Sequence, residues 1–118
     1  MGHTFLLALD AGGGGGHAVV VDADDGTVTR AFRPWRHAVA PDTSGLGFDF
    51  DLEGAWRLLA DAAAEALARA GAAPRDVAGI AATSMRHTTV VLDDAGAALL
   101  ATPNRDGRAI AEAFALLA

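Results

Sequence analysis

The 118-residue sequence predicts an α/β fold built on a mixed β-sheet. A helical repeat of apolar residues over 55–70 stands between two short apolar runs, 5–9 and 77–82. A strand–helix–strand order of this kind is typical of parallel neighbouring strands. Other apolar runs are joined by short turns that contain glycine, which is the pattern of antiparallel hairpins. A sheet that contains both kinds of connection is mixed, and helices flank it.

Three strands are expected in the first third of the chain. Phe5–Leu9 is wholly apolar, Ala18–Val21 is rich in valine, and Thr27–Phe32 alternates between β-branched and polar residues. Asp-Asp-Gly at 24–26 is a strong turn signal between the second and third strands. The segment 34–47 contains two prolines and an Asp-Thr-Ser-Gly run, so we expect a loop there.

The clearest helix follows this loop. Asp51 is placed to cap its start, and Gly71 with Pro74 ends it. Trp35 and Trp56 are expected to be packing residues rather than ligand contacts. The apolar positions that recur at helical spacing are Ala55, Leu58, Leu59, Ala62, Ala66, Leu67 and Ala70.

The remaining third predicts a strand, a hairpin and a final helix. Val77–Ala82 is the strand, Thr88–Leu92 and Ala97–Ala101 form the hairpin, and the helix covers about 107–117. The expected order is therefore β-β-β-α-β-β-β-α in one partial domain over residues 1–118. The sequence ends inside a helical pattern without a capping residue, which predicts truncation, although a natural terminus would look the same.

Composition excludes several classes of function. The net charge is −6 and all nine basic residues are arginine, so we expect no nucleic-acid or anionic-membrane partner. No cysteine is present, and the four histidines show no paired spacing, so disulfides and zinc sites are not expected. The acids at 22, 24, 25, 93 and 94 are interpreted as solvated turn residues. No long apolar run or basic leader is present, which predicts a cytoplasmic protein.

The stretch LDAGGGGGH, residues 9–17, carries the first candidate chemistry. It lacks the Gly-Lys-Ser/Thr of a P-loop, and a valine strand follows where a dinucleotide motif needs a helix. One interpretation is a tight hairpin whose glycines adopt positive φ and aim backbone N–H groups at an anion, with Asp10 binding magnesium. The other interpretation is a flexible turn in which Asp10 only ends a strand.

Four segments, in order, resemble the FGGY carbohydrate kinases of the actin/hexokinase/Hsp70 superfamily. They are LLALDAGGGGGHAVVVDADDG, PWRHAVAPDTSGLGFDFDLEGAW, TSMR and PNRDGRA, and the similarity is greatest to autoinducer-2 kinases. The resemblance implies part of a ribonuclease-H-like domain at the N-terminus of such a kinase. It also implies transfer of a phosphoryl group from ATP, with Mg²⁺, to a hydroxyl of a small sugar or polyol, such as autoinducer-2 or a pentulose.

The resemblance assigns roles to individual residues. Asp10 matches the aspartate that the family associates with magnesium and phosphate, and Gly12 matches the glycine that permits close backbone approach. Gly13 stands where the family has threonine, so a hydroxyl donor to phosphate is lost. His17 stands where a basic side chain is usual, and histidine is mostly neutral at pH 7.

The implied substrate residues are Ser84, Arg86, His87, Asn104 and Asp106. The planar fork of Arg86 suits sugar hydroxyls, whereas His87 replaces the acid that the family has after this arginine. Read without the family, Arg86 and His87 fit a plain surface turn equally well, and Asp106 fits a helix cap.

The resemblance places the catalytic aspartate and most of the ATP-binding domain beyond the matched region. We therefore expect this chain to be inactive alone, because phosphoryl transfer needs a nucleophile held in line with MgATP. An alternative is a non-catalytic remnant or sugar-binding module of the same fold, which the residues at Gly13, His17 and His87 favour. A partial sheet also exposes an edge and apolar surface, which predicts self-association.

Overall fold

The computed structural model describes residues 2–117 and divides them into two compact units. Unit 1 comprises residues 2–36 and 53–84, and unit 2 comprises residues 37–52 and 85–117. Each unit is built from segments that are distant in the sequence.

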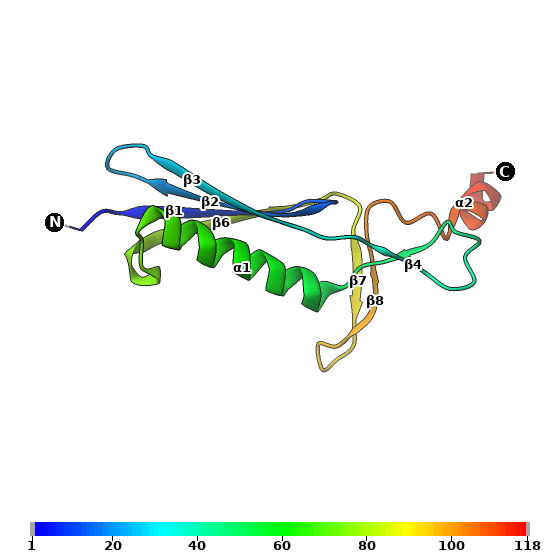
Figure 1. Cartoon of the computed structure of the whole chain (residues 1–118). Helices are drawn as coiled ribbons and strands as arrows, with labels where there is room; N and C mark the ends of the chain where they lie inside the picture. The colour runs from blue at the N-terminus through cyan, green and yellow to red at the C-terminus, as the bar shows by residue number, and fades with distance from the viewer. Residues whose placement is uncertain (1, 118) are drawn as a thin grey trace. The chain divides into compact units, whose positions relative to one another are not determined.

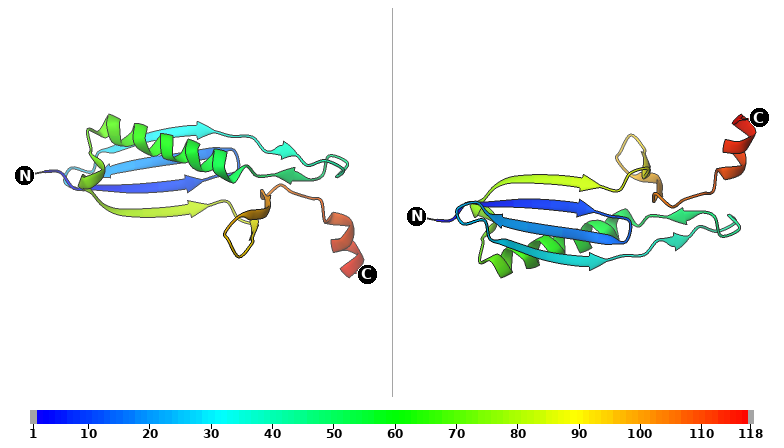
Figure 2. Two further views of the ribbon diagram at one scale, coloured as in Figure 1. Left: turned by 90° about the horizontal axis from the view of Figure 1, so that it is seen from below. Right: turned by 90° about the horizontal axis from the view of Figure 1, so that it is seen from above.

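Unit 1 contains the mixed sheet that the sequence predicts. Its strands are β1 (Phe5–Ala11), β2 (Gly15–Asp22), β3 (Val28–Pro34) and β6 (Val77–Ser84), in the spatial order β3-β2-β1-β6 (Figure 2). The β1–β2 and β2–β3 pairs are antiparallel, while β6 lies parallel to β1. The crossover from β3 to β6 passes through the helix, as the strand–helix–strand pattern indicates.

The helix α1 (Leu52–Ala70) lies along one face of this sheet (Figure 1). Alternate residues of β1, among them Phe5 and Leu7, are buried on that face, while Leu6 and Ala8 point the other way and are exposed. Ala62 and Ala66, one helical turn apart, are fully buried, and their small side chains let α1 approach the strands closely. The core cluster comprises Phe5, Leu7, Ala18, Val20, Ala31, Ala62 and Ala66.

An ion-pair network also ties α1 to the sheet. Glu65 of α1 pairs with Arg33 of β3 and with Arg69 one helical turn further along α1. The hydrogen bond from Arg33, opposed by partial burial, is the main reason that the pKa of Glu65 lies below its usual value. The η1 turn (Pro74–Asp76) then leads from α1 into β6.

Unit 2 consists of two small hairpins and a helix. Strands β4 (Ala38–Val39) and β5 (Phe48–Asp49) form one antiparallel pair, and β7 (Thr89–Leu92) and β8 (Ala98–Thr102) form the other. The backbone N–H of Phe50 donates to the carbonyl of Ala101 at 3.0 Å, which links the two hairpins. The helix α2 (Ile110–Leu117) ends the described chain.

The segment 34–47 is mostly irregular, as expected, but it also contains strand residues that were not expected. The strand β3 runs on to Pro34, and β4 pairs with β5, which follows the segment. The Thr43 hydroxyl closes the intervening loop because it donates to the Ala40 carbonyl and accepts from the Gly47 N–H, at 2.7 and 3.0 Å. A side-chain bridge of this kind has no periodic signal in the sequence.

Two further expectations are corrected. Trp56 is 66% exposed, because it lies on the face of α1 that points away from the sheet, so it is not a packing residue within unit 1. Asp22 is only 8% exposed and is therefore not a solvated turn acid, since it forms the last position of β2. Among the described residues, neither helix combines the length and the apolar character needed to cross a bilayer.

Candidate functional site

The five glycines lie at the connection between β1 and β2. Asp10 pairs with His17 across this hairpin, and Ala11 pairs with Gly16. The N–H of Gly12 donates to the carbonyl of Gly15 at 2.9 Å and closes the turn. The run of glycines is therefore the closed turn of a tight hairpin, as the first of the two interpretations of the sequence expects.

The expected backbone conformation of this hairpin is wrong. Gly12, Gly14, Gly15 and Gly16 all lie outside the left-handed region, and the described glycines with positive φ are Gly26, Gly45, Gly71 and Gly96. The Gly12 N–H is also used inside the turn rather than aimed outward. The glycines are needed here for another reason than positive φ.

That reason is space. A Cβ added at Gly15 would lie 2.4 Å from the Phe32 ring and 2.5 Å from the Arg33 carbonyl oxygen. A Cβ at Gly16 would lie 2.8 Å from Leu59 and 2.9 Å from Trp35. Gly15 and Gly16 therefore let an aromatic ring, a neighbouring strand and the helix close over β2.

The tip of the hairpin is different. Gly13 and Gly14 are exposed, and a Cβ at Gly14 would meet nothing within 4 Å. A ligand could therefore approach the backbone of the tip closely. The five glycines consist of a packed pair, Gly15 and Gly16, and an open tip around Gly14.

Asp10 and His17 share the sheet face that α1 does not cover. They are cross-strand neighbours, and Phe32 is the next residue across on β3. The rings of His17 and Phe32 lie 4.4 Å apart between centroids at an interplanar angle of 33°. His17 is thus held by an aromatic neighbour, and the exposed carboxylate of Asp10 lies beside it.

The structure also brings Ser84 to this end of the sheet. In the parallel β1–β6 pair, Asp10 is level with Thr83 and Ala11 is level with Ser84. Because parallel strands end at the same edge, the candidate phosphate residue Asp10 and the candidate substrate residue Ser84 lie at one edge of unit 1. Sheet edges at the carboxyl ends of strands are frequent ligand sites in α/β proteins.

Arg86 and His87 form the turn that follows in unit 2, and both are exposed. His87 has φ +63°, a conformation that side chains other than glycine seldom adopt. Such strained residues gather at functional sites, although a tight turn alone can also require one. His87 is the observation in this turn that favours a specific role over a plain surface loop.

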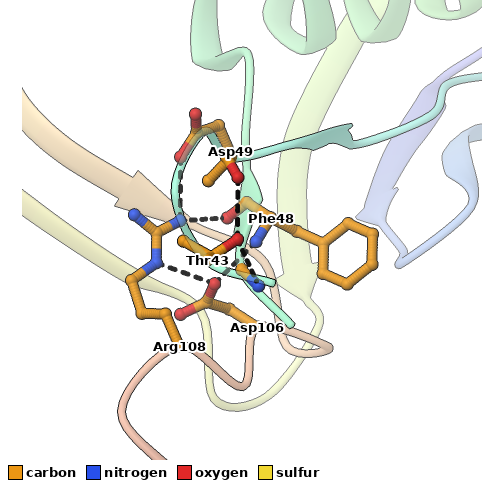
Figure 3. A network of polar contacts seen from close by, with 7 residues as sticks. Thr43, Phe48, Asp49, Asp106 and Arg108 are labelled. Carbon is orange, nitrogen blue, oxygen red and sulfur yellow. Dashed lines mark hydrogen bonds and ion pairs between the residues drawn. The ribbon is translucent and has the colours of Figure 1, made fainter. Parts of the chain in front are cut away.

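Asp106 belongs to a polar network that joins two segments of unit 2 (Figure 3). Its Oδ1 accepts the backbone N–H of Phe48 at 2.7 Å and the Nε of Arg108 at 2.8 Å. Arg108 also donates to the Phe48 carbonyl at 2.6 Å and to Asp49 Oδ1 at 2.8 Å. The guanidinium therefore clamps β5 to the segment that precedes α2.

Electrostatics agree with this geometry. Partial burial opposes ionisation of Asp106, but the hydrogen bonds from Phe48 and Arg108 outweigh it, and the pKa of Asp106 lies below its usual value. The hydrogen bonds to Asp49 and Asp106 raise the pKa of Arg108. The helix-cap interpretation of Asp106 is wrong, because α2 begins only at Ile110.

Asn104 precedes this network in an exposed turn. The guanidinium of its neighbour Arg105 lies 4.0 Å above the centre of the Phe48 ring. Asn104 is thus next in the chain to a segment that Arg105, Asp106 and Arg108 hold in place. The supporting role of Arg108 has a weak sequence signal, because a charge-pair partner 59 residues away cannot be identified from spacing.

A second polar cluster was missed by sequence reasoning. His3, Asp22 and Asp24 lie close together. Each has one potential metal-ligand atom, and these three atoms all lie within 4.8 Å of one another. His3 Nδ1 pairs with Asp22 Oδ2, and this hydrogen bond raises the pKa of His3. The N–H of Thr4 donates to Asp24 at 2.8 Å. The cluster fastens the residues before β1 to the β2–β3 turn.

Comparison with known sequences identifies related kinases. Over 108 residues, 92% of its length, the chain is 38% identical to the autoinducer-2 kinase of Escherichia coli K12. It is 35% identical over 111 residues to the autoinducer-2 kinase of Salmonella choleraesuis. The chain spans 20% and 21% of the length of these two relatives. No protein-family model matches the sequence.

Comparison with solved structures agrees. A xylulose kinase from Rhodospirillum rubrum is similar over 96% of this chain and 23% of its own, with a TM-score of 0.76 and 29% identity. A gluconate kinase from Lactobacillus acidophilus, 16% identical over 98% of this chain and 24% of its own, has a TM-score of 0.66 and supports the fold alone. The predicted resemblance to carbohydrate kinases and the partial α/β fold are both confirmed.

Proposed function

We propose that this chain forms the N-terminal part of an FGGY-type, ATP-dependent carbohydrate kinase that phosphorylates a hydroxyl of a small sugar or polyol. Autoinducer-2 and pentuloses are the proposed substrates, since the names of the relatives are autoinducer-2 kinase and xylulose kinase. The chain spans only about a fifth of those relatives, so we propose that it is inactive without the rest of a kinase. The proposal places it in the cytoplasm, where such an enzyme finds its ATP.

One observation carries this proposal. Asp10 and Ser84, which the resemblance assigns to phosphate and to sugar, lie at the carboxyl ends of the neighbouring parallel strands β1 and β6, although 74 residues separate them in the sequence. A phosphoryl donor and an acceptor hydroxyl must be brought together in line for transfer. Candidate subsites at the same end of the sheet support such a transfer.

The exposed groups around the β1–β2 hairpin tip are suited to bind ATP and Mg²⁺. The Asp10 carboxylate is exposed beside the hairpin tip, where a Cβ at Gly14 would meet nothing within 4 Å, which leaves room for a phosphate near the backbone. Bound magnesium would neutralise charge on the phosphates, and Asp10 would hold it directly or through water. Gly12, Gly13 and His17 complete the proposed phosphate contacts.

The substrate side would use the turn after β6. We propose that Ser84, Arg86 and His87 contact substrate hydroxyls, with Asn104 and Asp106 on the second segment of unit 2. The fixed donors of Arg86 suit paired hydroxyl oxygens. The strained backbone of His87 favours a binding role for the turn.

The proposal is tested in a chimera in which this chain replaces the matching fifth of the Escherichia coli autoinducer-2 kinase. We expect ATP-dependent phosphorylation of one sugar in a panel of autoinducer-2, pentuloses and polyols. Asp10→Asn should lower kcat by about 10- to 100-fold, because a group that positions the metal is lost. Asp94→Asn, an exposed turn acid, is the matched control and should leave the rate unchanged. A folded chimera without activity on any of these substrates would refute the proposal.

Gly13→Thr in the same chimera restores the hydroxyl found in the family. The expected result is a KM for MgATP that is about 5-fold lower, the equivalent of one added hydrogen bond of about 1 kcal/mol. Gly14→Thr is the control, because a Cβ at Gly14 would meet nothing within 4 Å and position 14 is not the family position. Equal KM values for the two variants would show that the hydroxyl at position 13 does not reach phosphate.

The second candidate function is a non-catalytic, sugar-binding module. The packing of His17 against Phe32 supports it, because an imidazole held against an aromatic ring is a poor substitute for a long basic side chain that reaches phosphate. Calorimetry of the chain with the sugar panel and with MgATP separates the two candidates. Saturable sugar binding together with an inactive chimera would support the module.

A further inference from the structure

The open end of the β7–β8 hairpin brings together the turn 85–88 and the segment 103–108 of unit 2. Thr89, the first residue of β7, pairs with Thr102, the last residue of β8, and the turn that joins the two strands lies at the other end (Figure 1). Arg86 precedes Thr89 by three residues, and Arg105 follows Thr102 by three residues. The antiparallel register therefore places the two arginines at the same end of the hairpin.

No acid is paired with either of these arginines. Both side chains are exposed, and none of the ion pairs among residues 2–117 includes Arg86 or Arg105. The acid of the second segment, Asp106, is paired with Arg108, and so is Asp49 of β5. The remaining acids of unit 2 lie outside both segments, and they are Asp42, Asp51, Asp93, Asp94 and Glu112.

The other polar side chains of the turn also supply hydrogen-bond donors. His87 stands where the kinase family has an acid, and its φ of +63° fixes an unusual backbone conformation there. The Thr88 Oγ1 is buried and has no hydrogen-bond partner among residues 2–117. A buried hydroxyl without a partner costs free energy, and a bound group that accepts its hydrogen bond would recover that cost.

We propose that the sugar bound at this end of the hairpin carries a carboxylate, and that Arg86 binds this carboxylate together with Arg105. The inference rests on the proposed function, because that function makes the turn after β6 the substrate side. The planar fork of a guanidinium forms two parallel hydrogen bonds with a carboxylate, and these are stronger than hydrogen bonds to a neutral hydroxyl. An acid at position 87 would repel such a substrate, so the histidine permits what the family acid disfavours.

The test compares a sugar acid with the neutral polyol of the same carbon chain, namely xylonate with xylitol. Calorimetry measures the Kd of each compound for the 118-residue chain and for the kinase chimera. We expect xylonate to bind about tenfold more tightly or better, because hydrogen bonds to a charged acceptor contribute more than neutral ones. The preference should shrink as the ionic strength rises. Equal or weaker binding of xylonate would overturn the proposal, as would the absence of xylonate binding to both proteins.

His87→Glu and His87→Gln form a matched pair, because the two side chains have the same length and meet the same positive φ. His87→Glu should abolish the preference for xylonate, since its carboxylate repels that of the sugar acid, whereas His87→Gln should keep most of it. Retention of the full preference in His87→Glu would overturn the proposal.

Arg105→Gln tests the second arginine. We expect several-fold weaker binding of xylonate in this variant, because one of the two cations is lost. Arg75→Gln, which replaces an arginine of unit 1 whose side chain is 87% exposed, is the control and should leave the Kd unchanged. Unchanged xylonate binding in Arg105→Gln would show that this arginine does not contact the carboxylate.

Phosphorylation is read separately from binding. A chimera that phosphorylates neutral sugars but binds xylonate no better than xylitol would retain the proposed function and reject the acidic substrate. A folded chimera that phosphorylates neither neutral sugars nor sugar acids, yet binds xylonate more tightly, would reject the kinase function and retain the carboxylate site. The two failures therefore remain distinguishable.

Discussion

Gly15→Ala is expected to destabilise unit 1 by about 2 to 3 kcal/mol, the cost of forcing a methyl group into a packed site. The added Cβ would lie 2.5 Å from the backbone carbonyl oxygen of Arg33, which cannot move without disturbing the β2–β3 pair. Gly16→Ala should cost less, because its contacts at Leu59 and Trp35 are side-chain atoms that can shift. Denaturant unfolding followed by tryptophan fluorescence measures both.

Gly14→Ala is the matched control from the same run of glycines. Its Cβ would meet nothing within 4 Å and its φ is not positive, so the only expected effect is a gain of about 0.5 kcal/mol from a less flexible unfolded chain. Equal effects of alanine at positions 14 and 15 would show that the hairpin is a flexible turn. The short distances from a Cβ at position 15 to Phe32 and Arg33 would then not reflect a cost in folding free energy.

The glycine run illustrates how far sequence reasoning reaches. The strands on either side, wholly apolar before it and valine-rich after it, were sufficient to predict a hairpin, and β1 and β2 confirm it. The reason for each glycine was not predictable. Positive φ was the natural expectation, but Gly15 and Gly16 are needed because Phe32, Trp35 and Leu59 pack over them. Those contacts join residues that are distant in the sequence, which a local pattern does not encode.

The same limit applies to the segment 34–47. Proline and glycine signals favoured a loop, yet β4 within the segment pairs with β5, which follows it. Arg108, about 60 residues later in the chain, donates hydrogen bonds to Phe48 and Asp49 of β5. Strong periodicity, by contrast, predicted α1 well, because an apolar stripe of a long helix is a local property.

The residues of the candidate site were identified by the resemblance to the kinase family. Their positions in space follow from the topology of the sheet. The parallel register that brings Asp10 and Ser84 to one edge follows from the β1–β6 pairing. A strand–helix–strand pattern predicts such a pairing in general but not its register. The positive φ of His87 has no specific sequence signal, since histidine is several-fold enriched in such positions but only a small fraction of histidines adopt them.

Asp106→Ala is expected to lower the stability of unit 2 by about 2 kcal/mol. The substitution removes the acceptor for the Phe48 N–H and for Arg108, and the side chain of Asp106 is only 13% exposed. Hydrogen exchange of the peptide around Phe48 should accelerate, which locates the loss in this unit. Asp94→Ala, an acid in an exposed turn, should leave both stability and exchange unchanged.

The pH dependence has a defined sign. The folded-state pKa of Asp106 is depressed, so its contribution to stability is present above the unfolded value of about 3.8 and is lost as the pH falls through the lower folded value. As the pH falls below about 4, unit 2 should therefore lose less stability in Asp106→Asn than in the unsubstituted chain. Acid unfolding measures this difference. If stability falls with acid pH in the same way in this variant, other carboxylates dominate the acid unfolding.

The Asp106 variants also separate two roles that the family resemblance leaves combined. A residue that only holds β5 against the segment before α2 should change stability and hydrogen exchange, while the KM for sugar in the chimera follows the folded fraction. A residue that contacts substrate should raise that KM in Asp106→Asn even where the variant is fully folded. Because Oδ1 already accepts two hydrogen bonds, we expect the structural effect to dominate, and Asn104 with Arg86 then become the stronger substrate contacts.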